Sequence, residues 1–393
     1  MKYAYLFDID LIERKKYPEF PKLPNHCLMK LSDYYKKKGY KVRLIYLPKY
    51  IPRKYESTNV YIGSALYSGN LVQFKKRLKL NQNIMIPIEK IKIGTPLDTC
   101  SKAEIPGIKC DYSEYDKMIQ RDNIKLQWYP CNVGFLTRGC IRHCQFCINR
   151  ERNQITEVNT IDEIYQKEGQ PIYLLDDNLF ESPNAVKHFN EIDEFMKNHK
   201  NIKISLQNGI DARNVTLEKL KALGKASKYF STLHTAWDNV KNSFIFKNII
   251  EIKKYSHARI KCYCLLGENI YSNEDFKKDI LGFMYRYINL MKIGVQPINQ
   301  LYEDDREEFK NKYWNLYTFF LKNYAFMKVS NMQTIYRKIP PNQKPIADKI
   351  VEMLEEFEWI ITTPVGKIVE DENFDLKMKS IADYIEIKHY SAN

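Results

Sequence analysis

Short apolar runs alternate with amphipathic segments along the first quarter of the chain. In residues 1–94 this pattern predicts four strands, at 3–9, 41–47, 59–66 and 83–88, and two intervening helices, at 25–38 and 71–79. Strands that alternate with helices pair in parallel, so residues 1–94 are expected to form a doubly wound α/β domain. Residues 95–129 contain several turn residues and little periodicity, which predicts a connector.

The alternation resumes after residue 129 and continues over six strand and helix units. The predicted strands are at 132–136, 171–175, 202–206, 228–233, 258–266 and 294–298, and the helices at 160–167, 182–198, 217–223, 237–254 and 273–291. This succession predicts that residues 130–300 form a partial (β/α)6 parallel barrel, with ligands at the carboxyl ends of its strands. Residues 301–393 are expected to be a helical C-terminal region, with an amphipathic helix at 346–357.

The composition limits the class of protein. With 44% hydrophobic residues and only 14 Gly and 16 Pro in 393, the chain is neither disordered nor collagenous. No apolar run approaches the roughly 18–20 residues of a membrane-spanning helix. Asp8 and Asp10 lie where a signal peptide would be uncharged. We therefore expect a soluble cytoplasmic protein with no membrane partner.

The positive charge is concentrated at the start of the chain. The formal net charge is +14, and residues 1–130 hold 25 Lys+Arg against 13 Asp+Glu, so they carry +12 of it. Most of the basic residues are Lys, whereas Arg is the residue that phosphate recognition favours. Two interpretations stay open, a solvated basic surface and a face that binds nucleic acid.

Three of the nine cysteines are grouped. Cys140, Cys144 and Cys147 have the spacing C-x3-C-x2-C. Three thiolates on one loop can hold three irons of a [4Fe–4S] cube and leave the fourth iron open. A structural zinc site needs a fourth ligand, and Cys262 and Cys264 are a poor second pair because neighbouring side chains on a strand point to opposite faces. We expect the others to be buried thiols; they are Cys27, Cys100, Cys110, Cys131, Cys262 and Cys264.

This motif, placed just after the first strand of a run of strand and helix units, resembles the radical S-adenosylmethionine superfamily. Phe146 stands before the last cysteine, where that family usually has an aromatic residue. The resemblance implies a [4Fe–4S] cluster whose open iron binds S-adenosylmethionine and a reductive cleavage that yields a 5′-deoxyadenosyl radical. It also implies an electron donor such as flavodoxin or ferredoxin.

The same resemblance implies cofactor contacts at later strand ends. Asp176 and Asp177 look like the carboxylate form of the site for the cofactor's amino group, although they could instead cap the following helix. Arg213 would face the cofactor's carboxylate, unless it forms a structural salt bridge with Asp211 or Asp176. Gly267 resembles the family's adenine contact, with a plain turn glycine as the alternative.

Two further strand ends resemble tracts of the same relatives. Trp237 and Asp238 follow the fourth predicted barrel strand. His234, directly after that strand, either lines the substrate side or is a packed core histidine. None of these residues is diagnostic of one reaction, so the substrate stays open.

The first domain resembles the cobalamin-binding-like domain that precedes the barrel in some members of the superfamily. Members that bind cobalamin usually carry D-x-H-x-x-G after the first strand, whereas His26 here lacks both the preceding acid and the following glycine. This departure disfavours cobalamin and favours a degenerate domain used for substrate docking.

Two alternative functions follow from the same features. The basic first third is also compatible with a methyl or methylthio transferase acting on nucleic acid. A binding module without enzymatic activity, in which the three cysteines hold zinc, is the other alternative.

Overall fold

The computed structural model describes most of the chain as two compact units. The described residues are 1–13, 22–65, 68–80, 86–94, 108–147, 149–150, 154–242, 244–302, 306, 312–324, 337 and 339–389. Residues 1–184 and 191–208 form the first unit, and residues 185–190 and 209–393 form the second. Cys100 and part of the strand predicted at 83–88 lie outside the described residues.

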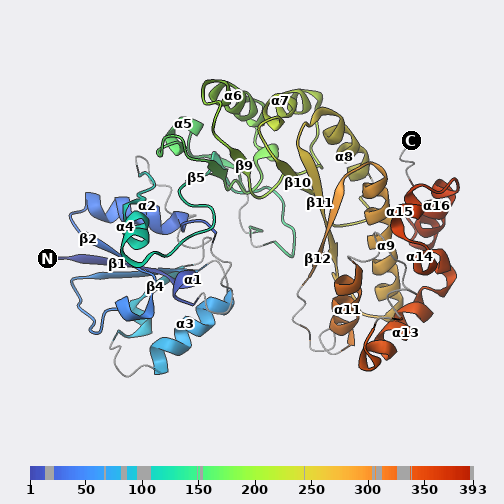
Figure 1. The fold of residues 1–393 in the computed structure, drawn as a ribbon, viewed down its shortest axis with the longest axis horizontal. Helices are drawn as coiled ribbons and strands as arrows, with labels where there is room; N and C mark the ends of the chain where they lie inside the picture. The colour runs from blue at the N-terminus through green and yellow to red at the C-terminus, as the bar shows by residue number, and fades with distance from the viewer. Residues whose placement is uncertain are drawn as a thin grey trace. The chain divides into compact units, whose positions relative to one another are not determined.

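The first unit begins with a four-stranded parallel sheet. Its strands are β1 (Tyr3–Asp8), β2 (Lys41–Ile45), β3 (Val60–Ser64) and β4 (Lys92–Gly94), in the order β2-β1-β3-β4 (Figure 1). This order is that of a doubly wound sheet, in which the chain moves to opposite edges from β1 and β3. The expected parallel α/β domain is therefore present, but the fourth strand was placed wrongly. It lies at Lys92–Gly94, after a 3-10 turn at Ile88–Lys90.

Helices cover both faces of this sheet. One face carries α2 (His26–Lys37) and α4 (Ser113–Asp122), and the other carries α1 (Ile9–Ile12) and α3 (Ser68–Leu80) (Figure 1). The Asn25 side chain caps α2 by accepting from the Leu28 N–H at 3.2 Å.

The helix α4 lies in the segment expected to be a connector. Tyr115 and Met118, each 1% exposed, belong to the same core as Leu44 of β2. Residues 113–122 therefore pack against the first sheet, and the core that they join also includes Cys131 and Val133. The sequence pattern was too weak to indicate this because few positions of the ten-residue helix are apolar.

A buried polar network fills the carboxyl ends of β1 and β3. Asn25 donates from Nδ2 to Ser64 Oγ at 3.0 Å, and its backbone N–H donates to Tyr115 Oη at 3.0 Å. The Tyr115 hydroxyl donates in turn to Asp8 at 2.7 Å. Burial and the neighbouring Asp10 raise the pKa of Asp8 to about 7.

The middle of the chain forms a second parallel sheet and a small hairpin. The sheet contains β5 (Asn132–Gly134), β8 (Ile172–Leu174) and β9 (Ile204–Leu206), and β6 (Thr137–Arg138) pairs antiparallel with β7 (Thr156–Glu157). Its helices are α5 (Ile161–Ile164), which starts with a capping box between Thr160 and Glu163, and α6 (Ala185–Asn198).

The second unit holds a third parallel sheet. Its strands are β10 (Thr232–Ala236), β11 (Arg259–Leu266) and β12 (Gln296–Leu301), with helices α7 (Leu217–Ser227), α8 (Phe244–Tyr255) and α9 (Asn273–Lys292) (Figure 1). All six predicted barrel strands are thus present, with shifted ends. They form two sheets that belong to different units, so closure into one partial barrel stays a prediction.

The C-terminal region is helical, as predicted. Its α-helices among the described residues are α11 (Trp314–Tyr324), α13 (Lys344–Met353), α14 (Glu358–Thr362), α15 (Val365–Val369) and α16 (Phe374–Tyr384). The helix expected at 346–357 corresponds to α13 and a 3-10 turn at Glu355–Phe357. Within the described part of the chain, no helix has the length and apolarity needed to span a membrane.

Asp8→Asn should change how stability depends on pH. The folded pKa of about 7 lies above the reference value of 3.8, so the contribution of Asp8 to stability is present at low pH and is lost as the pH rises through about 7. At pH 8 the variant should therefore have a higher free energy of unfolding in urea than the wild type, by up to about 4 kcal/mol, with little difference near pH 4. Asp162→Asn, at an exposed position of α5, is the control. Parallel stability curves for Asp8→Asn and wild type would contradict this account.

Candidate functional site

The three grouped cysteines lie on one loop that follows β6. All three are partly buried, and backbone and side-chain donors contact the sulfurs of Cys140 and Cys147. Cys140 Sγ accepts from the Arg142 N–H at 3.4 Å, and Cys147 Sγ accepts from the Asn149 N–H at 3.4 Å. Burial raises the pKa of the Cys147 thiol, and the nearby Cys140 and Cys144 thiols raise it further. The loop therefore gathers three thiols together with donors of the kind that tune cluster thiolates.

The geometry of these thiols bears on which metal they could hold. Among the described residues, no three His, Cys, Asp or Glu side chains converge as ligands of a single metal ion. A structural zinc needs such convergence, because all of its ligands meet at one ion. In a [4Fe–4S] cube each thiolate binds a different iron, so the sulfurs stand apart. A [4Fe–4S] cluster and a zinc ion thus place different demands on the spacing of the three thiols.

Asp176 ties the start of this loop to the middle sheet. It follows β8 and is fully buried. Its carboxylate accepts from the Leu136 N–H at 3.2 Å, and from the Thr137 N–H at 2.6 Å and hydroxyl at 2.9 Å. Burial raises its pKa to about 7, against the effect of these donors. Asp176 thus holds β6 at the carboxyl end of β8.

Asp177 and Glu181 hold the loop itself. Asp177 accepts from the Gly139 N–H at 2.7 Å and from Asn149 Nδ2 at 2.9 Å, so it contacts the chain on both sides of the cysteines. Glu181, whose side chain is 1% exposed, forms an ion pair with Arg142 inside the loop. Asn178, between these acids, donates from Nδ2 to Cys140 Sγ at 3.5 Å. The sequence located these acids, but their direction toward the loop depends on tertiary contacts.

Gly139 can only be a glycine at this position. Its φ is +102°, and a Cβ there would lie 2.0 Å from the carbonyl oxygen of Gln154, on the segment leading into β7. The hairpin and the cysteine loop therefore meet at Gly139 with no room for a side chain.

The remaining predicted contacts are placed as follows. Phe146 is partly buried in the cysteine loop. Arg213 pairs with Asp211, from Nε at 2.8 Å and Nη2 at 2.7 Å, as in the salt-bridge alternative. Gly267 has a φ of +86°, and its N–H donates to the partly buried Asp279 at 2.8 Å. His234 is partly buried and stacks on Tyr263 at 5.7 Å, which fits either interpretation of its role.

A buried arginine that the sequence did not single out organises the third sheet. Arg286 of α9 is 2% exposed. It donates to the carbonyl oxygens of Trp237 at 2.7 Å, Asp238 and Leu265 at 2.8 Å, at the carboxyl ends of β10 and β11. Burial raises the pKa of the Asp238 carboxyl to about 6, while the Arg286 charge acts to lower it. In the sequence, an arginine among the apolar residues of α9 could have pointed to this buried role.

The other described cysteines are buried thiols, as predicted. They are Cys27, Cys110, Cys131, Cys262 and Cys264. The described residues therefore contain one cluster-like group of cysteines.

The strand ends of the first domain bear on cobalamin, the group that the resemblance of this domain suggests. A doubly wound sheet binds ligands at the carboxyl ends of the strands where the order switches, here β1 and β3. That crevice is filled by Asp8, Asn25, Ser64 and Tyr115, each less than 10% exposed. His26 lines a different cavity, of about 450 Å³, and packs edge-on against the Phe135 ring. The described residues do not fit cobalamin at these strand ends.

Two solved structures with a TM-score of 0.50 share the fold of this chain. The cobalamin-dependent S-adenosylmethionine radical enzyme OxsB with aqua-cobalamin bound matches at a TM-score of 0.50 and 12% identity, covering 98% of this chain and 75% of OxsB. Apo OxsB labelled with selenomethionine matches at 0.50 and 13% identity, with the same coverage. SuiB of Streptococcus suis bound to S-adenosylmethionine gives 0.36 and 14%, covering 65% of this chain and 56% of SuiB. No family model and no curated protein matches the sequence.

At these identities the similarity to OxsB concerns the fold. It confirms the expected resemblance of the fold to radical S-adenosylmethionine enzymes that carry a cobalamin-binding-like first domain.

Gly139→Ala should disrupt the cysteine loop. The added Cβ requires the Gln154 carbonyl to move, and that displacement separates the loop from its contact with Asp177. We expect the variant, after anaerobic reconstitution, to retain much less iron per chain than the wild type. Gly169→Ala is the matched control, because Gly169 also has a positive φ but has no atom within 4 Å of a Cβ. Equal iron content in the two variants would refute the proposed role of Gly139.

Arg286→Met should destabilise the second unit. It leaves three buried carbonyl groups without their donor, which costs about 3 kcal/mol of unfolding free energy. Arg259→Met, at an exposed position of β11, should change stability little. The measurement is urea denaturation, and similar midpoints for the two variants would argue against the bridging role.

Proposed function

We propose that this chain is a radical S-adenosylmethionine enzyme. Cys140, Cys144 and Cys147 would hold a [4Fe–4S] cluster that, when bound and reduced, cleaves S-adenosylmethionine to give a 5′-deoxyadenosyl radical acting on a substrate. The fold shared with OxsB supports this proposal, but the observation that carries it is the three-cysteine loop. That loop is fastened to the carboxyl end of a parallel sheet by buried carboxylates.

The chain's own residues would position and shield the cluster. Asp176 and Asp177 keep the loop against β8, which limits the motion of the thiolates. We retain Phe146, Asp177, Arg213 and Gly267 as cofactor contacts. For Asp176 the complete burial of the carboxylate favours a positioning role through Thr137 over direct contact.

Arg213 would offer its guanidinium to the carboxylate of S-adenosylmethionine. The Arg213 side chain is 32% exposed, whereas that of its partner Asp211 is 8% exposed. Asp211 therefore orients the guanidinium group and leaves part of it accessible. A guanidinium fork matches a carboxylate with two parallel hydrogen bonds. An electron donor such as flavodoxin or ferredoxin would supply the reducing equivalent.

Removing one thiolate should abolish activity. Cys140→Ser, Cys144→Ser and Cys147→Ser should each lose the visible absorbance of the cluster and the reductive cleavage of S-adenosylmethionine. Anaerobically reconstituted wild type should contain about four irons and four sulfides per chain. Cys262→Ala, at a buried thiol of β11, is the control and should keep both properties. One zinc per chain with no cleavage of the cofactor would refute the proposal.

Labelled S-adenosylmethionine separates the reaction classes. With separate methyl and adenosyl labels, adenosyl label in 5′-deoxyadenosine with the methyl label left in methionine supports hydrogen abstraction from the substrate, whereas methyl label in a modified substrate supports methyl transfer. The nucleic-acid alternative predicts binding of tRNA that weakens with salt, because the first 130 residues carry most of the net positive charge.

A further inference from the structure

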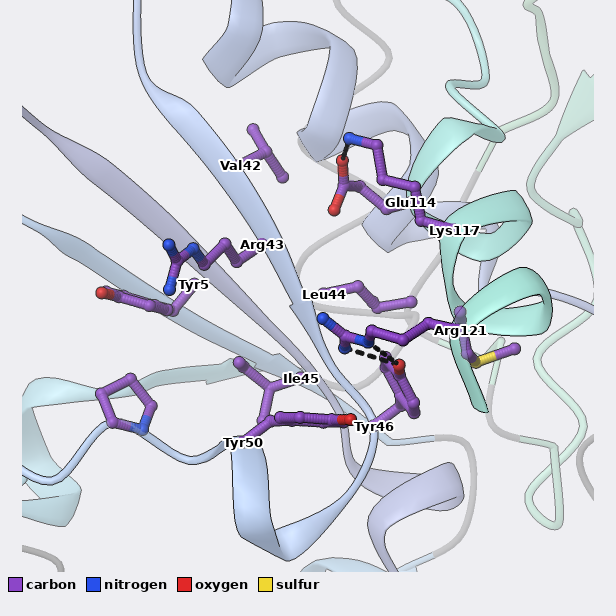
Figure 2. A pocket seen from close by; sticks show the side chains of 12 residues that line it. Tyr5, Val42, Arg43, Leu44, Ile45, Tyr46, Tyr50, Glu114, Lys117 and Arg121 are labelled. Carbon is purple, nitrogen blue, oxygen red and sulfur yellow. Dashed lines mark hydrogen bonds and ion pairs between the residues drawn. The ribbon is translucent and has the colours of Figure 1, made fainter. Parts of the chain in front are cut away.

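A groove runs along the outer edge of β2 in the first domain. Its volume is about 450 Å³, and the consecutive residues 42–46 form its floor. Side chains of successive strand residues point to opposite faces of a sheet, so a cavity lined by all five follows the edge of the strand rather than one face. Figure 2 shows this edge, with α4 beside it.

The floor of the groove presents backbone groups that no described strand uses. β2 pairs with β1 and with no other strand among the described residues. Lys41 donates its N–H to the Lys2 carbonyl on the β1 side at 2.9 Å. Because backbone groups alternate in direction along a strand, those of Val42 and Leu44 point away from β1, into the groove.

One stripe of α4 forms the wall. Glu114, Lys117, Met118 and Arg121 line the groove and have the spacing of a single helix face (Figure 2). An edge strand flanked by a helix is the arrangement in which an extended peptide adds to a sheet, with its backbone on the strand and its side chains against the helix.

The charges of the groove favour an acidic occupant. Arg43, Lys117 and Arg121 line it, whereas Glu114 is its one acidic lining residue. Lys117 pairs with Glu114 at 2.6 Å and Arg121 pairs with Asp122 at 3.1 Å, but their side chains remain 65% and 57% exposed, so a ligand can still reach both charges. The domain around them is strongly basic.

We propose that this groove binds an extended, acidic segment of a partner polypeptide, which pairs with β2 as an additional strand. A nucleic-acid backbone offers acceptors but no regular row of donors for the outward carbonyl groups of Val42 and Leu44, so a peptide fits the edge better. The filled crevice at β1 and β3 leaves the domain free to serve a docking role. The proposal does not depend on the radical chemistry, because binding needs neither the cofactor nor a reductant.

The probe is a labelled peptide of about ten residues that alternates Glu and Val, measured by fluorescence anisotropy on the full chain at low salt. Two further peptides carry N-methyl groups on all Val amides or on all Glu amides. Pairing with an edge uses every second amide, so one methylated peptide should bind about tenfold more weakly or not at all while the other stays close to the parent. Equal binding of all three peptides, or no binding of any, would overturn strand addition.

Protein variants test the location. Lys117→Glu should weaken binding of the parent peptide about fivefold, because it reverses a charge on the wall of the groove. Lys76→Glu makes the same change at an exposed position of α3 and should bind as the wild type does. Amide exchange at Val42 and Leu44 should slow when the peptide is bound. Equal effects of the two variants, or tRNA displacing the peptide and protecting the same amides, would count against a peptide site.

Discussion

The cysteine loop depends on carboxylates that are buried behind it. Asp176 and Asp177 follow β8 and accept hydrogen bonds from Thr137, Gly139 and Asn149. Burying a carboxylate is costly unless donors surround it, so these acids favour the one loop conformation that supplies the donors. The carboxylates therefore determine where the loop lies, and the sheet determines where the carboxylates lie.

Each of the three parallel sheets is organised at its carboxyl end by a buried ionisable residue. Asp8 does this in the first sheet, Asp176 in the second and Arg286 in the third. Parallel strands bring their carboxyl ends to the same edge, where loop backbone groups need partners. In the second sheet the loop of thiols beside this residue is only partly buried. In the first sheet the side chains around Asp8 fill the carboxyl ends of the strands.

The first domain thus has the topology of a ligand-binding fold in which, among the described residues, the domain's own polar side chains occupy the strand ends that usually bind ligands. Asn25, Ser64 and Tyr115 satisfy one another there, so a ligand would have to replace several buried hydrogen bonds. The accessible features of the domain lie instead along β2 and α4. A fold can keep its architecture while a different surface takes over recognition.

The sequence by itself determined the features that rest on local spacing. The three cysteines, the strands on either side of them and most helices follow from patterns within a few residues. Only the tertiary structure decided what α4 contacts, which donors surround Asp176 and Asp177, and that Arg286 bridges β10 and β11. These features join residues distant in the chain, and a carboxylate that caps a helix has the same local pattern as one that holds a remote loop. Packing distinguishes them, because burial removes water and makes each acceptor depend on the donors that the fold brings to it.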